Sequence, residues 1–437
     1  MISDRSVKVG ICGLGTVGSG TLSLIQQNFE EISTRARAAI EVVHIGARRD
    51  NPTCDTSDIR ISRDIFEVAR DPQVDVLVEL IGGIEPAKTL LLEAIANGKH
   101  VVTANKALIA EHGNELFRAA EEQGVFLSFD AAVAGAIPVI GALREGLAAN
   151  QIRSVAGIIN GTANFILTEM RDHGRVFEDV LREAQAKGYA EADPTFDVEG
   201  VDTAHKLTIL ASIAFGIPLK FDEVFTEGIG HLQRIDVQFA EELGYGVKHL
   251  GIARRVDEGV EIRVHPTLIS HDVLLAHVDG VMNAIWIDGD ASGPTLFYGA
   301  GAGSLPTASA VVADIVEIAR NIEADGIMKP HLGVVQEDQK DLQVLPISEC
   351  ITGYYMRITA LDKPGVMLSI SRILTDAGVS IDAMIQKEAE PGASHVPLVL
   401  ITSPAKEAIL EKAVAKLEAL EEVVEPVIRI RVEDLEK

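Results

Sequence analysis

Residues 6–20 read SVKVGICGLGTVGSG, and this stretch decides the fold of the first part of the chain. An apolar run leads directly into three glycines spaced as G-x-G-x-x-G, and a helical pattern starts within the motif. Such glycines let the backbone turn tightly and approach a pyrophosphate at a helix N-terminus. The stretch therefore predicts a dinucleotide-binding turn, with a purely structural glycine turn as the alternative. The residues predicted to bind the cofactor here are Gly13, Leu14, Gly15, Thr16, Val17 and Gly18.

Short β-branched runs alternate with helical patterns through the rest of the first 135 residues. This order predicts an α/β, Rossmann-type domain with a parallel sheet over residues 1–135. A glycine-rich turn feeds a further helix at 303–322, which we expect to complete this domain, with Gly303 at the cofactor. The strand-like runs are EVVHIGAR, VDVLVELIG, HVVTANK and VFLSFDAAVAG.

Two further domains are predicted beyond the first. Residues 136–332 mix helical and strand-like patterns, which indicates an α+β domain that we expect to serve catalysis and dimerisation. Residues 333–352 are polar with little periodicity and form the candidate linker. From 353 to 433 the order is strand, helix, strand, strand, helix, strand, which is typical of a ferredoxin-like domain.

The composition narrows the class of protein. The 437 residues carry a formal net charge of −26, which argues against binding to a nucleic-acid backbone. Three widely spaced cysteines indicate neither a disulfide framework nor a zinc site, and they fit a reducing compartment. The first apolar run is too short for a signal peptide or a membrane span. We therefore expect a cytoplasmic protein with no membrane or nucleic-acid partner.

The end of the second predicted strand bears on the choice of cofactor. Arg48 and Arg49 stand where an NAD-specific site often places a carboxylate on the ribose 2′-hydroxyl. Arginine at this place favours a 2′-phosphate, so the sequence predicts NADP. Asp50 follows directly and keeps NAD open as the cofactor, and a solvated arginine pair is the alternative without a binding role.

Candidate catalytic residues lie in two segments. HVVTANK closes a predicted strand at the sheet edge where ligands bind, which makes Thr103 and Lys106 candidates for cofactor contacts and Lys106 a candidate catalyst. GYAEADPTFDVEGVDTAHK, at 188–206, packs five carboxylates and Lys206 into an apolar neighbourhood. Asp202 and Lys206 stand four apart on a helix and can pair. The alternatives are a surface lysine and a solvated acidic helix entry with a capping role.

Four stretches together resemble homoserine dehydrogenase in order and spacing, over almost the whole chain. They are CGLGTVGSG, TANKALIA, GYAEADPTFDVEGVDTAHK and GAGSLPTASAVVADI. The resemblance implies reversible interconversion of L-aspartate 4-semialdehyde and L-homoserine with NAD(P)H, a step towards threonine, methionine and isoleucine.

The resemblance also implies roles for single residues. Lys206 corresponds to the proton donor and acceptor at the reacting oxygen, and Lys106 is similar to the lysine beside nicotinamide and substrate. An ammonium group there both stabilises negative charge on oxygen and delivers the proton. Glu191 matches the residue that binds the amino group of homoserine, and the carboxylates of Asp197 and Asp202 match groups that orient the substrate and Lys206. The residues predicted to bind substrate are Gly188, Tyr189, Glu191 and Asp197.

A monovalent cation is a further implication of the resemblance. The family holds Na⁺ largely through backbone carbonyls in the turn that here follows the strand FLSF. The matching positions are Asp130, Val133, Gly135 and Ile137, and family members commonly carry glutamate where this chain has Asp130. The alternative is a strand-to-helix turn without an ion.

The C-terminal residues from Tyr354 to about Val432 resemble an ACT domain. Its most recognisable feature is LDKPGVM at the first strand-to-helix turn, where Asp362 and Gly365 match part of an amino-acid pocket. The resemblance implies feedback binding of threonine and assembly into a homodimer or homotetramer, because ferredoxin-like domains pair at their edges. The alternative is a dimerisation module that has lost its ligand.

Two other functions remain open at the level of the sequence. One is a different NAD(P)-dependent amino-acid dehydrogenase, which would not need Lys206 together with Glu191. The other is a non-catalytic sensor of amino acids and nucleotides, which would bind cofactor without turnover.

Overall fold

The computed structural model describes residues 5–257, 259–322, 329–387 and 394–435. The chain divides into two compact units, each assembled from three separate segments. Unit one comprises Met1–Gly161, Asp202–Val224 and Val281–Leu342. Unit two comprises Thr162–Val201, Phe225–Gly280 and Gln343–Lys437.

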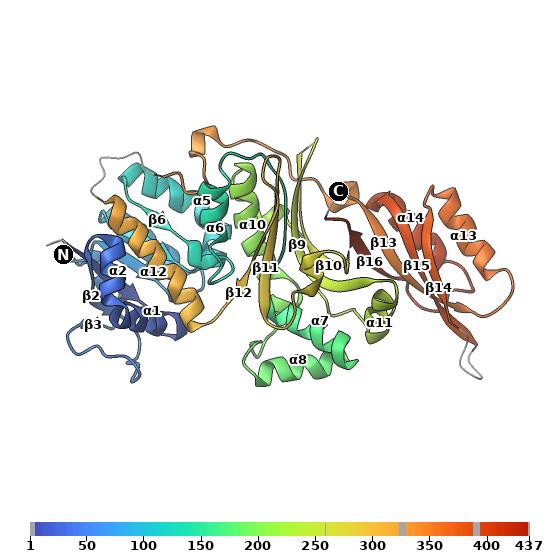
Figure 1. Ribbon diagram of the computed structural model, residues 1–437, viewed down its shortest axis with the longest axis horizontal. Helices are drawn as coiled ribbons and strands as arrows, with labels where there is room; N and C mark the ends of the chain where they lie inside the picture. Colours follow the sequence, from blue (N-terminus) through green and yellow to red (C-terminus); the bar gives the residue numbers. More distant parts are fainter. Residues whose placement is uncertain (1–4, 258, 323–328, 388–393, 436–437) are drawn as a thin grey trace. The chain divides into compact units, whose positions relative to one another are not determined.

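A six-stranded, fully parallel sheet forms the centre of unit one (Figure 1). Its order reverses direction at β1, as in doubly wound folds, and the carboxyl ends of the strands meet at one edge. This confirms the predicted Rossmann-type α/β fold. The strands in spatial order are β3 (Arg60–Ser62), β2 (Ala39–Gly46), β1 (Ser6–Cys12), β4 (Val76–Glu79), β5 (His100–Thr103) and β6 (Leu127–Ser128).

Helices pack on this sheet in two groups. The first group is α1 (Thr16–Gln27), α2 (Phe29–Ala36) and α12 (Ser304–Asn321), whose apolar faces share one core with β1 and β2. A helix was predicted at 303–322, and α12 lies within these residues and packs against α1 and α2. The second group is α3 (Ile65–Arg70), α4 (Ala87–Ala96) and α5 (Lys106–Gln123).

The remaining part of unit one carries a buried helix and a small antiparallel sheet. The helix α10 (Val201–Phe215) is buried almost all round and mostly apolar, and its ionisable side chains are Asp202, His205 and Lys206. The sheet consists of β7 (Ile152–Ile158), β11 (Met282–Gly289) and β12 (Gly293–Ala300). The strand β12 was not predicted, because its alternation is interrupted by glycine and proline.

Unit two is built around a second sheet. Its strands in spatial order are β9 (Tyr245–Val256), β10 (Gly259–Ser270), β16 (Ile428–Glu433), β13 (Ile351–Leu361), β15 (His395–Lys406) and β14 (Ile381–Gln386), and β8 (Phe225–Thr226) also pairs with β10. Its helices are α7 (Gly161–His173), α8 (Phe177–Ala186), α9 (Thr195–Val198), α11 (Arg234–Glu242), α13 (Val366–Asp376) and α14 (Glu407–Glu418).

The last six of these elements in chain order confirm the predicted ferredoxin-like arrangement. They run β13, α13, β14, β15, α14, β16, with their own apolar core. The sequence did not predict that β16 also pairs in parallel with β10, from Thr267–Arg431 to Ile269–Glu433. The C-terminal fold therefore shares one sheet with the β9–β10 hairpin. Within the described ranges, no helix combines the length and the apolar character needed to cross a membrane.

Candidate active site

The glycine-rich turn has the geometry of a pyrophosphate cradle. Gly13 adopts φ +102°, and a Cβ there would lie 2.5 Å from the Leu80 carbonyl oxygen. A Cβ on Gly18 would lie 2.0 Å from the Gly13 carbonyl oxygen, so glycine is required for the close contact of turn and helix. Gly15 precedes α1 and faces open space, with no atom within 4 Å of an added Cβ. The turn therefore leaves room for an anion at the N-terminus of α1.

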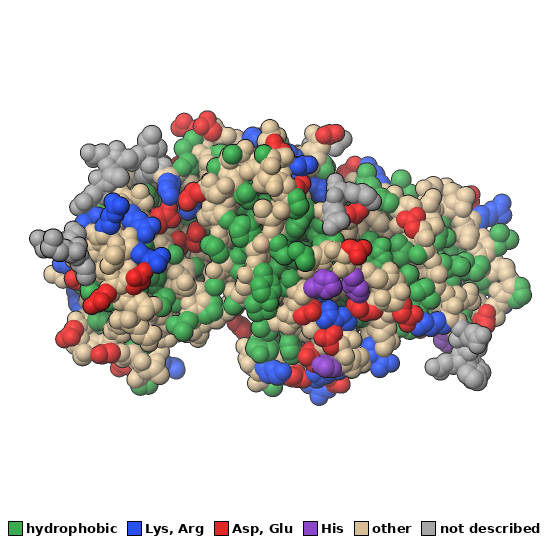
Figure 2. Space-filling model, viewed as in Figure 1, with side chains coloured by type: hydrophobic (Ala, Val, Ile, Leu, Met, Phe, Trp, Pro, Cys, Tyr) green, Lys and Arg blue, Asp and Glu red, His purple; other side chains and the backbone are tan. Residues whose placement is uncertain are grey.

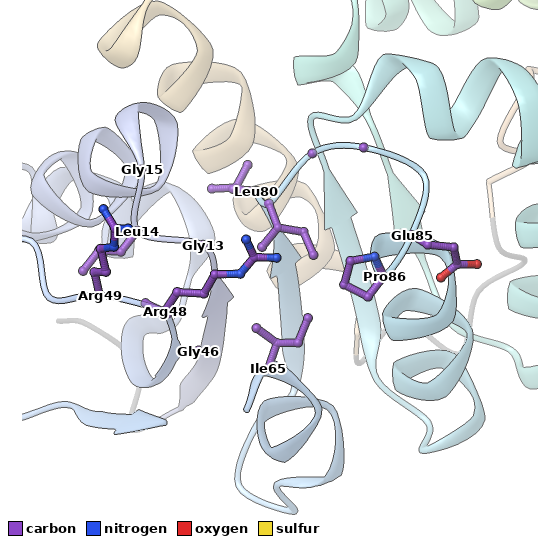
Figure 3. Close-up of a pocket in the computed structure, with 14 residues that line it drawn as sticks. Gly13, Leu14, Gly15, Gly46, Arg48, Arg49, Ile65, Leu80, Glu85 and Pro86 are labelled. Atoms are coloured by element: carbon purple, nitrogen blue, oxygen red, sulfur yellow. The ribbon is translucent and has the colours of Figure 1, made fainter. Parts of the chain in front are cut away.

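A cavity of about 700 Å³ opens beside this turn (Figure 3). Of the predicted cofactor-binding residues, Gly13, Leu14, Gly15, Arg48 and Arg49 line it. Its size suits an extended ligand such as a dinucleotide. Its other lining residues were not among the residues predicted to bind the cofactor; they are Gly46, Ala47, Ile65, Leu80, Ile81, Gly82, Gly83, Glu85 and Pro86.

The remaining predicted cofactor residues lie around the cavity rather than in its lining. Thr16 and Val17 form the first turn of α1, and the Ser304 hydroxyl next to Gly303 donates to the Thr16 carbonyl oxygen at 2.7 Å. Gly303 thus marks where α12 begins against α1. Thr103 is fully buried, and its hydroxyl donates to the Glu79 carboxylate at 2.6 Å.

The two arginines at the end of β2 line the cavity, whereas Asp50, which follows them, pairs with another residue. Figure 3 shows the Arg48 side chain extending into the cavity between Ile65 and Leu80. Asp50 instead accepts a hydrogen bond from Arg63 at 2.7 Å, and Arg63 also donates to the Ala47 carbonyl oxygen. The Asp50 carboxylate is therefore already paired.

Lys106, Asp202 and Lys206 come together in unit one, as the sequence predicted for Asp202 and Lys206. The Asp202 carboxylate is 4% exposed, and its two oxygens accept from Lys206 Nζ at 2.7 Å and from Lys106 Nζ at 2.8 Å. Lys206 is 10% exposed and Lys106 37%. We call these three residues the lysine–aspartate cluster. Lys106 is the first residue of α5, so the sheet edge positions it, whereas the other two belong to α10.

The cluster carries more positive than negative charge. Burial alone would raise the pKa of Asp202, but the ammonium groups of Lys206 and Lys106 outweigh it and hold that pKa well below its usual range. One carboxylate thus stays ionised between two lysines, and the excess positive charge favours a negative charge developing nearby.

Two residues that form hydrogen bonds with this cluster had not been predicted. Asn160 Nδ2 donates to Asp202 at 2.9 Å, and the Ile159 carbonyl oxygen accepts from Lys206 Nζ at 2.7 Å. Both follow the buried strand β7 directly. The sequence offered one signal for Asn160: it is a polar residue that lies directly between a buried strand and a helix.

The four predicted substrate-binding residues lie in unit two. The Thr162 hydroxyl donates to the Tyr189 carbonyl oxygen at 2.7 Å, and the Tyr189 ring packs edge-on against Phe165. Gly188 adopts φ +75° ahead of it, and Glu191 is exposed. Asp197 is half-buried in α9.

The predicted cation turn is an irregular, buried segment. Asp130 opens a short 3₁₀ turn, and Gly135 adopts φ +53°, with an added Cβ only 2.7 Å from the Gly301 carbonyl oxygen. The Asp130 Oδ1 atom is buried without a hydrogen-bond partner, and Arg144 Nη2 lies 3.9 Å away. Burial raises the pKa of Asp130 against the opposing charge of Arg144. Among the described residues, no group of three or more His, Cys, Asp or Glu side chains is placed to hold a metal ion.

The ferredoxin-like region contains its own cavity of about 350 Å³. Asp362 and Gly365, the two predicted regulatory residues, both line it at the start of α13. Gln386 closes the side formed by β14, and Val396 and Leu398 give it an apolar floor.

The parallel sheet, its glycine-rich turn and the buried lysine–aspartate cluster define a nicotinamide-dependent oxidoreductase. Comparison with known proteins gives the family. The family model described as homoserine dehydrogenase matches residues 138–316, its NAD binding domain matches 13–130, and an ACT domain matches 354–422. The chain belongs to the homoserine dehydrogenase family and acts as an NAD(P)-dependent oxidoreductase on a CH–OH group.

Individual relatives agree over the full length. A homoserine dehydrogenase of Pseudomonas aeruginosa is 59% identical, with 99% of this chain and 100% of the relative covered. The crystal structure of a homoserine dehydrogenase from Thiobacillus denitrificans is 54% identical, with a TM-score of 0.94 and complete coverage of both chains. A hyperthermophilic archaeal homoserine dehydrogenase in complex with NADPH is 27% identical, with a TM-score of 0.62 over 72% of this chain and 98% of the other.

Proposed function

We propose that the homoserine dehydrogenase reaction of this chain uses Lys206 as the proton donor to the substrate oxygen and NADPH as the hydride donor. The observation that carries this proposal is the lysine–aspartate cluster, in which two ammonium groups share a single buried carboxylate. An aldehyde that accepts a hydride develops negative charge on its oxygen, and this cluster supplies the matching positive charge.

The chain's own groups divide the work of the reaction. A nicotinamide bound beside the glycine-rich turn would supply the hydride for the carbonyl carbon of aspartate 4-semialdehyde. Lys206 gives its proton to the carbonyl oxygen, and in the reverse direction it takes the proton from the hydroxyl of homoserine. Asp202 and the Ile159 carbonyl oxygen fix the Lys206 ammonium group in one orientation. Lys106 adds a second positive charge at the more exposed side of the cluster.

The amino group of the substrate needs an anionic partner, and we assign it to Glu191. This carboxylate is exposed to solvent, so its side chain can reach the ammonium group of a substrate without a prior cost of burial in the protein. Asp197 is assigned to substrate orientation, and Gly188 and Tyr189 to the backbone and ring that shape this segment. Glu191→Gln should raise the KM for homoserine with a smaller change in kcat, which steady-state kinetics would measure.

The choice of NADPH rests on the arginines of the cavity. Arg48 and Arg49 line it, whereas Asp50 is already paired with Arg63 and is thereby drawn away from a ribose hydroxyl. An arginine pairs with a 2′-phosphate by charge-assisted hydrogen bonds. Arg48→Ala should reduce kcat/KM for NADPH roughly tenfold or more and leave that for NADH nearly unchanged. An equal loss with both cofactors would contradict this assignment.

The decisive experiment for the proposed mechanism follows homoserine-dependent reduction of NADP⁺ and NAD⁺ by absorbance, in wild type and Lys206→Ala. We expect kcat to fall by roughly a thousandfold in the variant while cofactor binding persists. Lys99→Ala is the matched control, because Lys99 is a buried lysine of the same unit whose ammonium group donates to the backbone carbonyl oxygens of Asp71 and Val74. It should lower the unfolding temperature and retain kcat. A Lys206→Ala enzyme with wild-type kcat would refute the proton-transfer role.

A Na⁺ ion is proposed in the turn formed by Asp130, Val133, Gly135 and Ile137. The buried Oδ1 of Asp130 and the glycine conformation at 135, where a side chain would strike another backbone, fit a cation held by backbone oxygens. Cation dependence of the unfolding temperature, with Na⁺ compared against tetramethylammonium at equal ionic strength, tests this site independently of activity.

Threonine is the proposed effector of the C-terminal cavity. Asp362 offers a carboxylate for an ammonium group, and the N-terminus of α13 beside Gly365 offers backbone N–H groups for a carboxylate. Calorimetric titration with threonine, in wild type and Asp362→Ala, should show binding only in wild type. Binding of threonine equally to both would place the effector elsewhere.

A homodimer or homotetramer in the cytoplasm completes the proposal. Figure 2 shows hydrophobic side chains gathered over β11 and β12, and Tyr298 on β12 is 59% exposed. An apolar strand at the edge of a sheet is a surface that a second copy covers. Light scattering of wild type and Tyr298→Asp measures whether this strand holds the oligomer together.

A further inference from the structure

Glu79 is a buried carboxylate at the centre of the sheet edge that faces the cofactor. It is the last residue of β4, lies between the ends of β1 and β5, and is 0% exposed. Within the described residues it forms no ion pair with a lysine, arginine or histidine. A buried charge without a counter-charge is costly unless hydrogen bonds replace its water. The partners of Glu79 therefore show what this carboxylate is kept for.

Three donors satisfy the carboxylate, and they come from two different segments. Its Oε1 atom accepts from the backbone N–H groups of Ile81 at 2.8 Å and Gly82 at 3.0 Å. Its Oε2 atom accepts from the Thr103 hydroxyl at 2.6 Å. Ile81 and Gly82 line the cofactor cavity, so one end of Glu79 holds the loop that shapes that cavity.

The other end leads to the start of α5. The Thr103 hydroxyl also accepts from the Asn105 backbone N–H at 3.0 Å. Asn105 caps α5 by accepting from the Leu108 N–H at 3.2 Å, and its Nδ2 donates back to the Gly83 carbonyl oxygen at 2.6 Å. Lys106, the next residue, begins the helix and pairs with Asp202.

We propose that Glu79 is a positioning residue for the dehydrogenase reaction, whose carboxylate couples the cavity loop at 81–83 to the helix start that carries Lys106. A carboxylate fits this place because it accepts at both oxygens at once, and charge strengthens each bond. Cofactor affinity and the placement of the Lys106 ammonium group then depend on one network. This inference rests on the proposed role of Lys106 only for its effect on kcat, because its effect on cofactor affinity is independent of that role.

The first test removes the link at Thr103. Thr103→Val keeps the shape and deletes the hydroxyl that joins Glu79 to Asn105, whereas Thr103→Ser keeps the hydroxyl. We expect Thr103→Val to raise the KM and the dissociation constant for NADPH and to lower kcat, each roughly tenfold, and Thr103→Ser to restore both. Thr208→Val is the matched control, because this buried hydroxyl donates within α10 to the Ala204 carbonyl oxygen.

The second test uses Glu79→Gln alone and in a Lys106→Ala background. Alone, it should weaken NADPH binding, measured by fluorescence titration, and lower kcat. In the Lys106→Ala background it should still weaken binding but cause no further loss of kcat, because the effect on kcat passes through Lys106. A Lys106→Ala enzyme with unchanged kcat would refute the role of Lys106, and the binding measurements would then still decide the role of Glu79.

The opposite outcomes are equally plain. If Thr103→Val and Glu79→Gln lower the unfolding temperature but leave kcat, KM and NADPH affinity at wild-type values, Glu79 is a structural residue and the proposal is wrong. If Glu79→Gln fails to fold, the Thr103 pair decides the question, because Thr103→Val replaces the hydroxyl that carries the link by a methyl group, whereas Thr103→Ser keeps the hydroxyl and loses only the methyl group of threonine.

Discussion

The lysine–aspartate cluster of unit one and the buried arginines of unit two balance their charges in opposite ways. In the cluster, the Asp202 carboxylate serves two ammonium groups. In unit two, the Arg263 guanidinium is 2% exposed and meets Glu433 at 2.6 Å and Glu261 at 3.3 Å. The lysine–aspartate cluster therefore has an excess of positive charge, whereas the network around Arg263 has none.

Other buried arginines of unit two repeat the second pattern. Arg431 bonds to Glu227 at 2.7 Å and to Glu407 at 2.8 Å, and Arg357 bonds to the fully buried Asp236 at 2.6 Å. Because carboxylates match or outnumber guanidinium groups here, these networks are electrostatically complete and need no ligand. In the lysine–aspartate cluster, by contrast, the excess positive charge is available for a negative charge that develops on the substrate.

Asp202→Asn breaks the cluster and should have the largest effect. Two ammonium groups lose their shared counter-charge, so we expect kcat to fall roughly a hundredfold to a thousandfold and stability to fall by about 3 kcal/mol at neutral pH. Asp202 has a folded pKa below its unfolded value, so its stabilisation is present above about pH 4 and is lost as the pH falls further. Denaturant unfolding at pH 7 and pH 3 should show a difference between wild type and variant that shrinks with acid. A constant difference would exclude the ion pair as its origin.

Arg263→Met tests the balanced pattern and should separate stability from catalysis. Removal of the guanidinium takes an ion-pair partner from the buried Glu261 and leaves the buried Glu433 with Arg254 at 3.0 Å, which should cost about 3 kcal/mol of stability. Turnover by the folded protein should stay near wild type, because Arg263 touches no group of the reaction. The double variant Arg263→Met/Glu433→Gln should regain part of the lost stability in denaturant unfolding. If kcat fell as far as in Asp202→Asn, the contrast between the two networks would be wrong.

The same contrast explains which features could be predicted from sequence. The pair Asp202–Lys206 was predictable because residues four apart on a helix share a face, and the glycine-rich turn because its backbone demands are local. The partnership of Lys106 with Asp202 joins residues far apart in the chain, and no local pattern reports it. The hydrogen bond from Asn160 has the same long-range origin.

Long-range pairing also hid parts of the fold. The order of strands in the C-terminal region followed from alternation and length, but the pairing of β16 with β10 depends on residues more than 150 positions apart. The balanced arginine networks accompany this pairing, since Arg263 lies on β10 and Glu433 on β16. In the sequence, Arg263 and Glu433 have the pattern of ordinary charged strand residues, because the periodicity of one strand gives no information about a partner on a distant strand.

Substitution of a buried histidine in either unit should have the smallest effect on the enzyme at neutral pH, because these side chains are buried without charge. The histidines therefore test whether the two units differ in burial or only in charge balance. Desolvation lowers the pKa of His331 in unit one and of His249 in unit two to about 4, against backbone hydrogen bonds that raise it. Both folded pKa values lie below the unfolded value of about 6.5, so the unfolded chain binds more protons between pH 6.5 and 4. Stability should therefore fall by roughly 3 kcal/mol for each histidine as the pH drops through this window, with full stability above it. Unfolding midpoints of His331→Gln and His249→Gln should depend less steeply on pH than those of wild type. Because desolvation acts alike on both histidines, the two variants should show a similar decrease in the slope of unfolding midpoint against pH. A decrease in only one variant would show that the units differ in burial as well as in charge balance.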